Sequence, residues 1–151
     1  MFSTKHIRLQ AYIFLLAVPL NLMWEVAQIR AYDFPETSLM TGVIGCFVPS
    51  LGDGLMTLII YWTGWLLFRE PKWPLNPGAK GYLLMVGTGL VLAVGVEWNA
   101  LYWTGSWAYD ERMITIPFLG VGLLPLLQMM ILPTATILLL PLFWKKLGQT
   151  V

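Results

Sequence analysis

Residues 123–144 read LLPLLQMMILPTATILLLPLFW, a run without a single charged side chain. A helix that crosses the hydrocarbon core of a bilayer needs about 20 mostly apolar residues, and this run is long enough. The rest of the chain has the same character, because 58% of its 151 residues are hydrophobic and only 11% are charged. Soluble domains carry about a quarter charged residues. The composition therefore predicts an integral membrane protein.

Three further segments are long and apolar enough to span a membrane. We therefore predict an all-α, polytopic membrane protein with four transmembrane helices, formed by one integral membrane domain over residues 1–151. The predicted helices cover roughly residues 9–29, 50–68, 81–103 and 123–144.

The two connections on the side away from the termini, residues 31–49 and 104–122, are poor in charge but hold apolar stretches too short to span. Such stretches are typical of interfacial or re-entrant segments, so we expect outer interfacial segments lying over the bundle. The two halves also resemble each other. Glu25 is followed by Tyr32-Asp33, and Glu97 is followed by Tyr109-Asp110, which predicts a two-fold parallel duplication of a two-helix unit.

The basic residues predict the orientation of the chain. Of the nine Lys and Arg residues, all except Arg30 and Arg112 fall on the side that the two termini share. Cytoplasmic loops of membrane proteins carry the excess of Lys and Arg. We therefore expect cytoplasmic N- and C-termini, in a bacterial inner (plasma) membrane.

Several classes of function are excluded by the same inventory. A net charge of +1 gives no reason to expect a nucleic-acid partner. One cysteine, Cys46, cannot form an intramolecular disulfide or a thiolate metal cluster. The single histidine, His6, lies on the cytoplasmic flank, outside any site within the membrane. We expect no metal and no cofactor.

The polar residues inside the predicted helices share one depth. Glu25, Asp53, Glu97 and Gln128 each lie about 16–17 residues from the basic residue at the cytoplasmic end of their helix, which is roughly 25 Å at ~1.5 Å per residue. Ionisable groups at this depth normally face the bundle or a wet cavity. Clustered carboxyl groups in poor solvent also tend to hold a proton, which suits general acid catalysis or proton exchange.

A candidate site follows from this layer. The candidate catalytic residues are Glu97, Glu25 and Asp53. The candidate substrate-binding residues are Gln128 at the same level, Gln28 and Asn21 on the Glu25 face, Trp24 and Trp98 beside an acid, and Trp103 nearer the outer border.

Structural explanations stay open for the same residues. Asp53 could be the capping-box partner of Ser50 at the start of the second helix. Gln128 could make only an interhelical hydrogen bond, and the tryptophans could form an aromatic belt at the membrane border. The whole layer could also consist of separate, hydrated helix ends.

The C-terminal half resembles a known family. An acid in a helix, then GSWAY (105–109) and LLPLLQ (123–128), is similar to the membrane-embedded lycopene cyclases of the heterodimeric type, over residues 95–140. The resemblance implies a small helical membrane protein that cyclises a linear carotene by acid–base chemistry without redox change. It implies that Glu97 is the upstream acid. Where that family has paired glutamates after the proline, this chain has Leu127 and Gln128.

A second resemblance covers the whole arrangement of WEVAQ (24–28), GDG (52–54) and LGVGLLPLLQ (119–128). These motifs resemble those of small bacterial four-helix membrane proteins of unestablished activity. This resemblance supports the fold and implies no reaction.

Two hypotheses follow. In the first, the protein is an enzyme that performs acid–base chemistry, a cyclisation or isomerisation, on a lipophilic, isoprenoid-like substrate in a cavity open sideways to lipid. In the second, it is a non-enzymatic lipid binder, a proton- or cation-coupled transporter, or an accessory subunit of a membrane complex. The expected partners are membrane lipids or a lipophilic small molecule. The transporter version predicts a homo-oligomer with the polar layer at the protomer interface.

Overall fold

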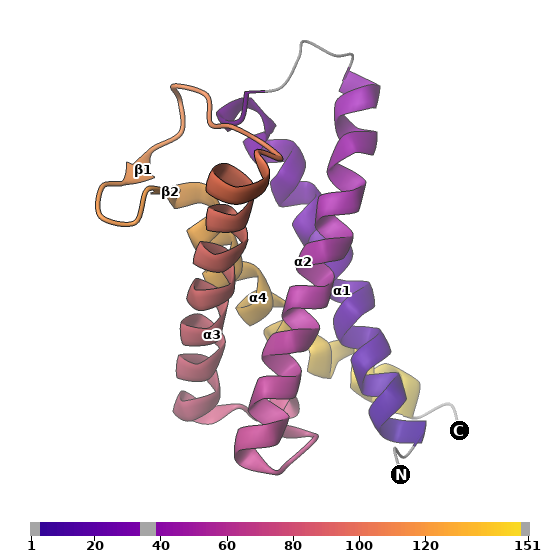
Figure 1. The fold of residues 1–151 in the computed structure, drawn as a ribbon. Helices are drawn as coiled ribbons and strands as arrows, with labels where there is room; N and C mark the ends of the chain where they lie inside the picture. The colour runs from indigo at the N-terminus through magenta and orange to yellow at the C-terminus, as the bar shows by residue number, and fades with distance from the viewer. Residues whose placement is uncertain (1–3, 34–38, 149–151) are drawn as a thin grey trace.

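The computed structural model of the protein describes residues 4–33 and 39–148 (Figure 1). Within these ranges, four helices are long and apolar enough to cross a membrane, which confirms the predicted all-α, polytopic fold. The elements are α1 (Thr4–Gln28), the 3-10 turn η1 (Ile29–Ala31), α2 (Leu39–Phe68), the 3-10 turn η2 (Trp73–Leu75), α3 (Gly78–Trp98), the π-helical turn η3 (Asn99–Thr104), the strands β1 (Thr115–Ile116) and β2 (Val121–Gly122), and α4 (Leu123–Gly148).

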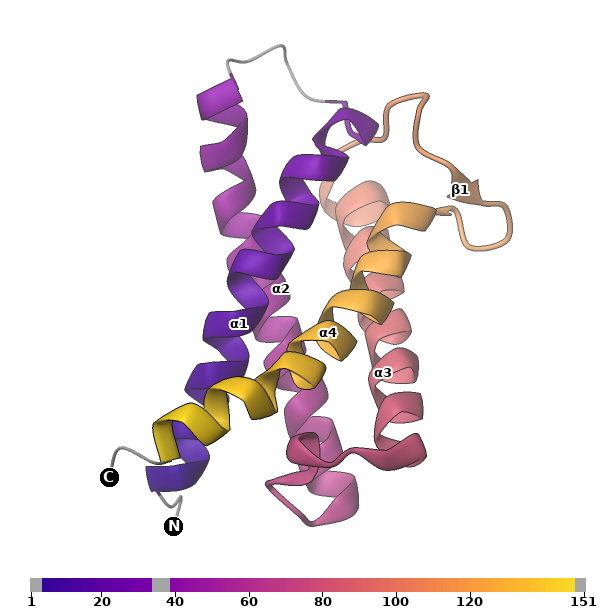
Figure 2. The same cartoon turned by 180° about the vertical axis from the view of Figure 1, so that it is seen from behind.

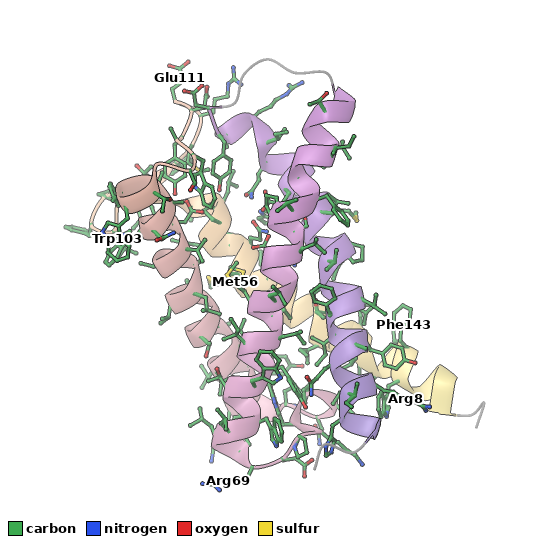
Figure 3. All side chains as sticks on the ribbon, turned by 45° about the vertical axis from the view of Figure 1, so that its right-hand side comes forward. Arg8, Met56, Arg69, Trp103, Glu111 and Phe143 are labelled. Atoms are coloured by element: carbon green, nitrogen blue, oxygen red, sulfur yellow. The ribbon has the colours of Figure 1, made fainter. Side chains whose placement is uncertain are left out.

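The four helices run alternately up and down, so α1 begins and α4 ends at the same end of the bundle (Figures 1 and 2). Arg8 and Arg69 also lie at that end, whereas Glu111 lies at the opposite one (Figure 3). We call these the terminal end and the loop end. Which end faces the cytoplasm stays a prediction.

The second helix begins earlier than predicted. It starts at Leu39 instead of residue 50, and Pro49 lies inside it. Residues 39–49 are therefore part of helix α2, of which Thr41–Phe68 is long and apolar enough to cross a membrane, while residues 34–38 of the predicted segment lie outside the described residues. The apolar run before Pro49 continues directly into the predicted helix, and a proline is tolerated in a membrane helix because neighbouring groups compensate for the missing N–H.

This correction also removes the structural explanation for Asp53. Ser50 lies in the middle of α2, where its Oγ donates a hydrogen bond to the carbonyl oxygen of Cys46 at 2.7 Å. Such bonds back to the preceding turn are common for serine in helices. The capping-box interpretation of Ser50 and Asp53 is therefore wrong.

The other outer connection crosses the loop end as a strap, which we define as residues 105–122. It pairs with the segment after α1 at an isolated antiparallel bridge between Tyr32 and Tyr109. The N–H of Asp33 donates to the carbonyl of Ala108, and the N–H of Asp110 donates to the carbonyl of Ala31, both at 3.0 Å. The two bonds are reciprocal, as a two-fold relation would require, and the duplication itself stays a prediction.

The terminal half of the bundle is a packed apolar core, with Ile13, Tyr61, Met85 and Leu140 almost fully buried. Helix α1 packs along α2 and α4, and α3 packs mainly along α4. Helices α3 and α4 approach closely at Gly89, where an added Cβ would lie 2.2 Å from the carbonyl oxygen of Met129. That distance leaves no room for a side chain, so the crossing depends on glycine.

We expect Gly89→Ala to destabilise the protein by about 1–3 kcal/mol, because overpacking forces the backbones apart. Gly87→Ala is the matched control, since a Cβ at Gly87 would meet nothing within 4 Å. Thermal unfolding in mild detergent measures both. Equal melting temperatures for the two variants would contradict the close approach.

A candidate intramembrane carboxylate site

The side-chain amide of Gln128 connects three helices in the loop-end half. It comes from α4, and its Nε2 lies 2.7 Å from Asp53 Oδ2 of α2. The same nitrogen lies 3.0 Å from Glu25 Oε1 and 3.0 Å from Asn21 Oδ1, both of α1. A primary amide has two N–H groups, so three acceptors share two donors. Gln128 is 2% exposed, and this group is therefore a buried polar centre.

A second amide fixes the direction in which Gln128 points. Gln28 Nε2 donates to Gln128 Oε1 at 2.9 Å and to Glu25 Oε1 at 3.0 Å. Gln28 Oε1 accepts from Trp24 Nε1 at 2.9 Å. An indole N–H can only donate, so Trp24 sets the orientation of the Gln28 amide. Gln28 then holds the oxygen of Gln128 toward itself and the N–H groups of Gln128 toward the carboxyl groups.

The carboxyl groups of Glu25 and Asp53 lie close together, because both contact the same amide nitrogen of Gln128, at 3.0 and 2.7 Å. Two carboxyl groups brought this close in a buried position favour a state in which one of them carries a proton. Carboxyl pairs that share a proton are familiar from aspartic proteases. The pair therefore has the chemistry of a proton donor.

Glu97, on α3, has a different set of partners. Its carboxyl group accepts hydrogen bonds from Tyr109 Oη and from Trp107 Nε1 at 3.3 Å. The ring of Tyr32 packs edge-on against Tyr109 and Trp107, with centroids 5.6 and 6.4 Å away. Glu97 is 4% exposed. Two hydrogen-bond donors stabilise the ionised form of an acid, which is the form that can accept a proton.

The two phenols beside Glu97 stay protonated donors. Burial, and after it the interaction with Glu97, raises the pKa of Tyr32 and of Tyr109 above the ordinary tyrosine value, which is about 10. Tyr109 Oη also accepts from the N–H of Gly122 at 2.7 Å. The phenol therefore connects β2, at the end of the strap, to Glu97.

A cavity of about 640 Å³ lies between these two groups. Glu25, Asp53, Glu97 and Gln128 are in its wall, together with apolar residues such as Met129. Ligand pockets in proteins have volumes of about 300–1,000 Å³ and mostly apolar walls with a few polar groups. The cavity has the size and the lining of a site for a small lipophilic molecule.

The cavity opens between α2 and α3. The exposed residues of the lining include Gly45, Val48 and Gly52 of α2, Val96 of α3 and Ser106 of the strap. Those from α1 and α4 are buried or half-buried. Helices α2 and α3 also separate toward the loop end (Figure 1). The opening faces sideways, which is the direction of lipid for a membrane-spanning bundle.

The structure brings most of the predicted site residues together. Glu25, Asp53, Glu97 and Gln128 share one cavity, as their common depth suggested. Asn21 and Gln28 are 1% and 5% exposed, and both are hydrogen-bond partners of Gln128. They do not line the cavity.

The three predicted tryptophans do not line the cavity either. Trp24 supports Gln28 from within α1. Trp98 is 42% exposed, with its Nε1 bonded to the carbonyl of Leu119. Trp103 is 78% exposed and lies on the outside of the bundle (Figure 3). Adjacency to an acid in a helical sequence was the wrong criterion, because consecutive helix residues point about 100° apart.

Sequence reasoning missed the residues that hold Glu97, namely Tyr32, Trp107 and Tyr109. A signal was present, since both tyrosines belong to the Tyr-Asp pairs that the two halves share, and Trp107 and Tyr109 belong to GSWAY. These pairs lie in loops, where no helical spacing places a side chain. Their contact depends on the bridge between the strap and the segment after α1.

Within residues 4–33 and 39–148, no group of three or more His, Cys, Asp or Glu side chains is arranged to hold a metal ion. The chain matches no protein-family model, no curated protein and no solved structure.

We expect Gln128→Leu to lower the melting temperature, because an acceptor left unsatisfied in a buried position costs about 1–3 kcal/mol. Gln10→Leu is the matched control. Gln10 accepts one exposed hydrogen bond, from Trp62 Nε1 at 3.3 Å, so its loss should change stability by less than about 0.5 kcal/mol. Thermal unfolding of both variants in the same detergent makes the comparison. A Gln128 variant as stable as the Gln10 variant would argue against the network.

Proposed function

We propose that this membrane protein binds a neutral, isoprenoid-like lipophile and moves a proton on it, in a cyclisation or isomerisation without redox change. The observation that carries the proposal is the cavity of about 640 Å³ with carboxyl groups from α1, α2 and α3 in its wall. The apolar lining of the cavity favours a lipophilic ligand, and the carboxyl groups favour proton transfer as the reaction.

Charge favours a neutral ligand. The titratable groups among the described lining residues are Glu25, Asp53, Glu97, Tyr32 and Cys46, and none of those lining residues is Lys, Arg or His. Recognition of a phosphate needs cationic side chains or free N–H groups. A phosphorylated lipid would instead meet carboxyl groups in a poorly hydrated space, where like charges repel strongly.

The two groups of acids would have complementary roles. The Glu25–Asp53 pair adds its proton to a carbon–carbon double bond, which leaves a carbocation on the substrate. Ring closure or migration of the double bond follows, and Glu97 removes a proton from a neighbouring carbon. Atoms and electrons balance without an oxidant or reductant. The rings of Trp107 and Tyr32 would stabilise the cation, and exchange with water at the loop end would restore the starting protonation.

The resemblance to the lycopene cyclases supports the same class of reaction. That family has paired glutamates after the proline of the last motif, where this chain has Leu127 and Gln128. Here Gln128 instead contacts two carboxyl groups from other helices, those of Glu25 and Asp53. The paired acids would thus come from α1 and α2 instead of α4.

Filling the cavity should abolish binding. Gly52 lines the cavity, and a Cβ there would meet nothing within 4 Å, so Gly52→Leu places a side chain in the space without removing a hydrogen bond. We expect purified wild-type protein to retain an isoprenoid-like lipophile, detected by mass spectrometry and absorption spectroscopy, and the variant to lose it. Gly87→Leu, outside the cavity, should keep it. A lipophile retained equally by all three proteins would contradict the proposed site.

The acid–base step is tested in deuterated water. Vesicles containing the protein are incubated with linear polyprenes such as squalene or lycopene, and products are analysed by mass spectrometry. We expect an isomer that has gained a deuteron and lost a proton. Glu97→Gln should slow its formation by about 10²-fold or more, whereas Glu111→Gln, at an exposed position on the strap, should not.

The outcomes separate the alternatives. Binding without deuterium in any isomer would favour a non-enzymatic lipid binder or an accessory subunit. Proton-dependent uptake of a cation into vesicles, with no bound lipophile, would favour a transporter and overturn the proposal.

A further inference from the structure

The strap ends in a loop that presents apolar side chains away from the bundle. We define the hairpin loop as residues 114–120, which contain β1 and the turn before β2. Phe118 at its tip is 99% exposed, and Ile114 is 67% exposed. The two opposite views show this loop projecting sideways from the top of α3 (Figures 1 and 2). Its tip therefore lies beside the bundle and not above it.

Specific bonds hold the loop in that position. Trp98 Nε1 donates to the carbonyl of Leu119 at 2.8 Å, and Tyr102 Oη donates to the carbonyl of Gly120 at 2.9 Å. Both donors come from the end of α3 and from η3. Gly120 has a φ of 65°, a left-handed conformation that favours glycine. The exposure of Phe118 is thus built into a fixed turn.

Part of the backbone of the loop is bonded within the protein. The carbonyl of Ile116 accepts from the N–H groups of Leu119 and Gly120, at 3.1 and 2.8 Å, and the carbonyl of Ile114 accepts from Leu123 at 2.7 Å. Strands β1 and β2 pair with each other, and Pro117 has no N–H to satisfy. In lipid, backbone polar groups must find partners inside the protein.

The apolar surface of the loop continues the lipid-facing surface of α3. Val91 on α3 is 73% exposed and Trp103 in η3 is 78% exposed. Residues 113–122 carry no charge, and the charged triplet 110–112 precedes them. Arg112 and Asp110 form an ion pair at 3.5 Å. The strap is therefore divided into a charged part at the loop end and an apolar part directed sideways.

We infer that the hairpin loop inserts Phe118 into the membrane leaflet at the loop end and anchors the strap at the boundary of headgroups and acyl chains. The partner is a lipid surface. Aromatic residues such as Trp98, Tyr102 and Trp103 belong at that boundary. The continuity of this apolar surface with α3 favours lipid over a protein partner. This inference is independent of the proposed function.

Spin labels test the insertion. In a Cys46→Ala background, a nitroxide is attached at Phe118→Cys, and the protein is reconstituted in phosphatidylcholine vesicles. Collision rates are measured with oxygen, which concentrates in lipid, and with a water-soluble nickel chelate. Val91→Cys is the lipid-facing reference, and Glu111→Cys is the aqueous one. We expect an oxygen-to-nickel collision ratio at position 118 that is several-fold above that at 111 and close to that at 91.

Ile114→Cys provides a second position if the first variant folds poorly, with the same expected direction. A ratio at both positions equal to that at 111 would show that the loop lies in water and would overturn the inference. Low collision rates with both reagents would show that a protein covers the loop, and would overturn it as well. Neither result would depend on whether the cavity binds a lipophile.

Discussion

The loop-end half of this bundle depends on one buried amide, which supplies two N–H groups to three oxygen acceptors. Lipid offers no partner for a polar group, so each polar side chain carried into the membrane must be satisfied inside the protein. Gln128 does this for Glu25, Asp53 and Asn21. It thereby ties α4 to α1 and α2 in the loop-end half. Trp24 and Gln28 matter because they orient that amide.

The cavity follows from how this requirement is met. The acids of α1 and α2 are satisfied from α4, whereas the acid of α3 is satisfied from the strap by Trp107 and Tyr109. No described hydrogen bond joins the two groups directly, and the space between them stays open toward the gap between α2 and α3. Two acidic groups with different partners, facing one apolar space, are what proton transfer on a lipophile would need.

Residue spacing located the acids but not their surroundings. Counting from the basic flanks placed Glu25, Asp53, Glu97 and Gln128 at one level, because a helix rises by a constant ~1.5 Å per residue. The same reasoning failed for Trp98, since its neighbour Glu97 points toward the cavity and Trp98 does not. The predicted start of α2 is also wrong. Pro49 with Ser50 and Asp53 has the pattern of a helix start, but these residues lie inside one continuous helix.

The sequence by itself determined the class of the protein, its four membrane-crossing helices and the depth of its acids, because these depend on composition and on a fixed rise per residue. Only the tertiary structure decided which acids lie together, which donors hold Glu97, and where the cavity opens. Those properties depend on contacts between segments far apart in the chain, such as Gln128 with Asn21 and Tyr109 with Tyr32. No local spacing specifies them, since they arise when the strap and four helices pack together.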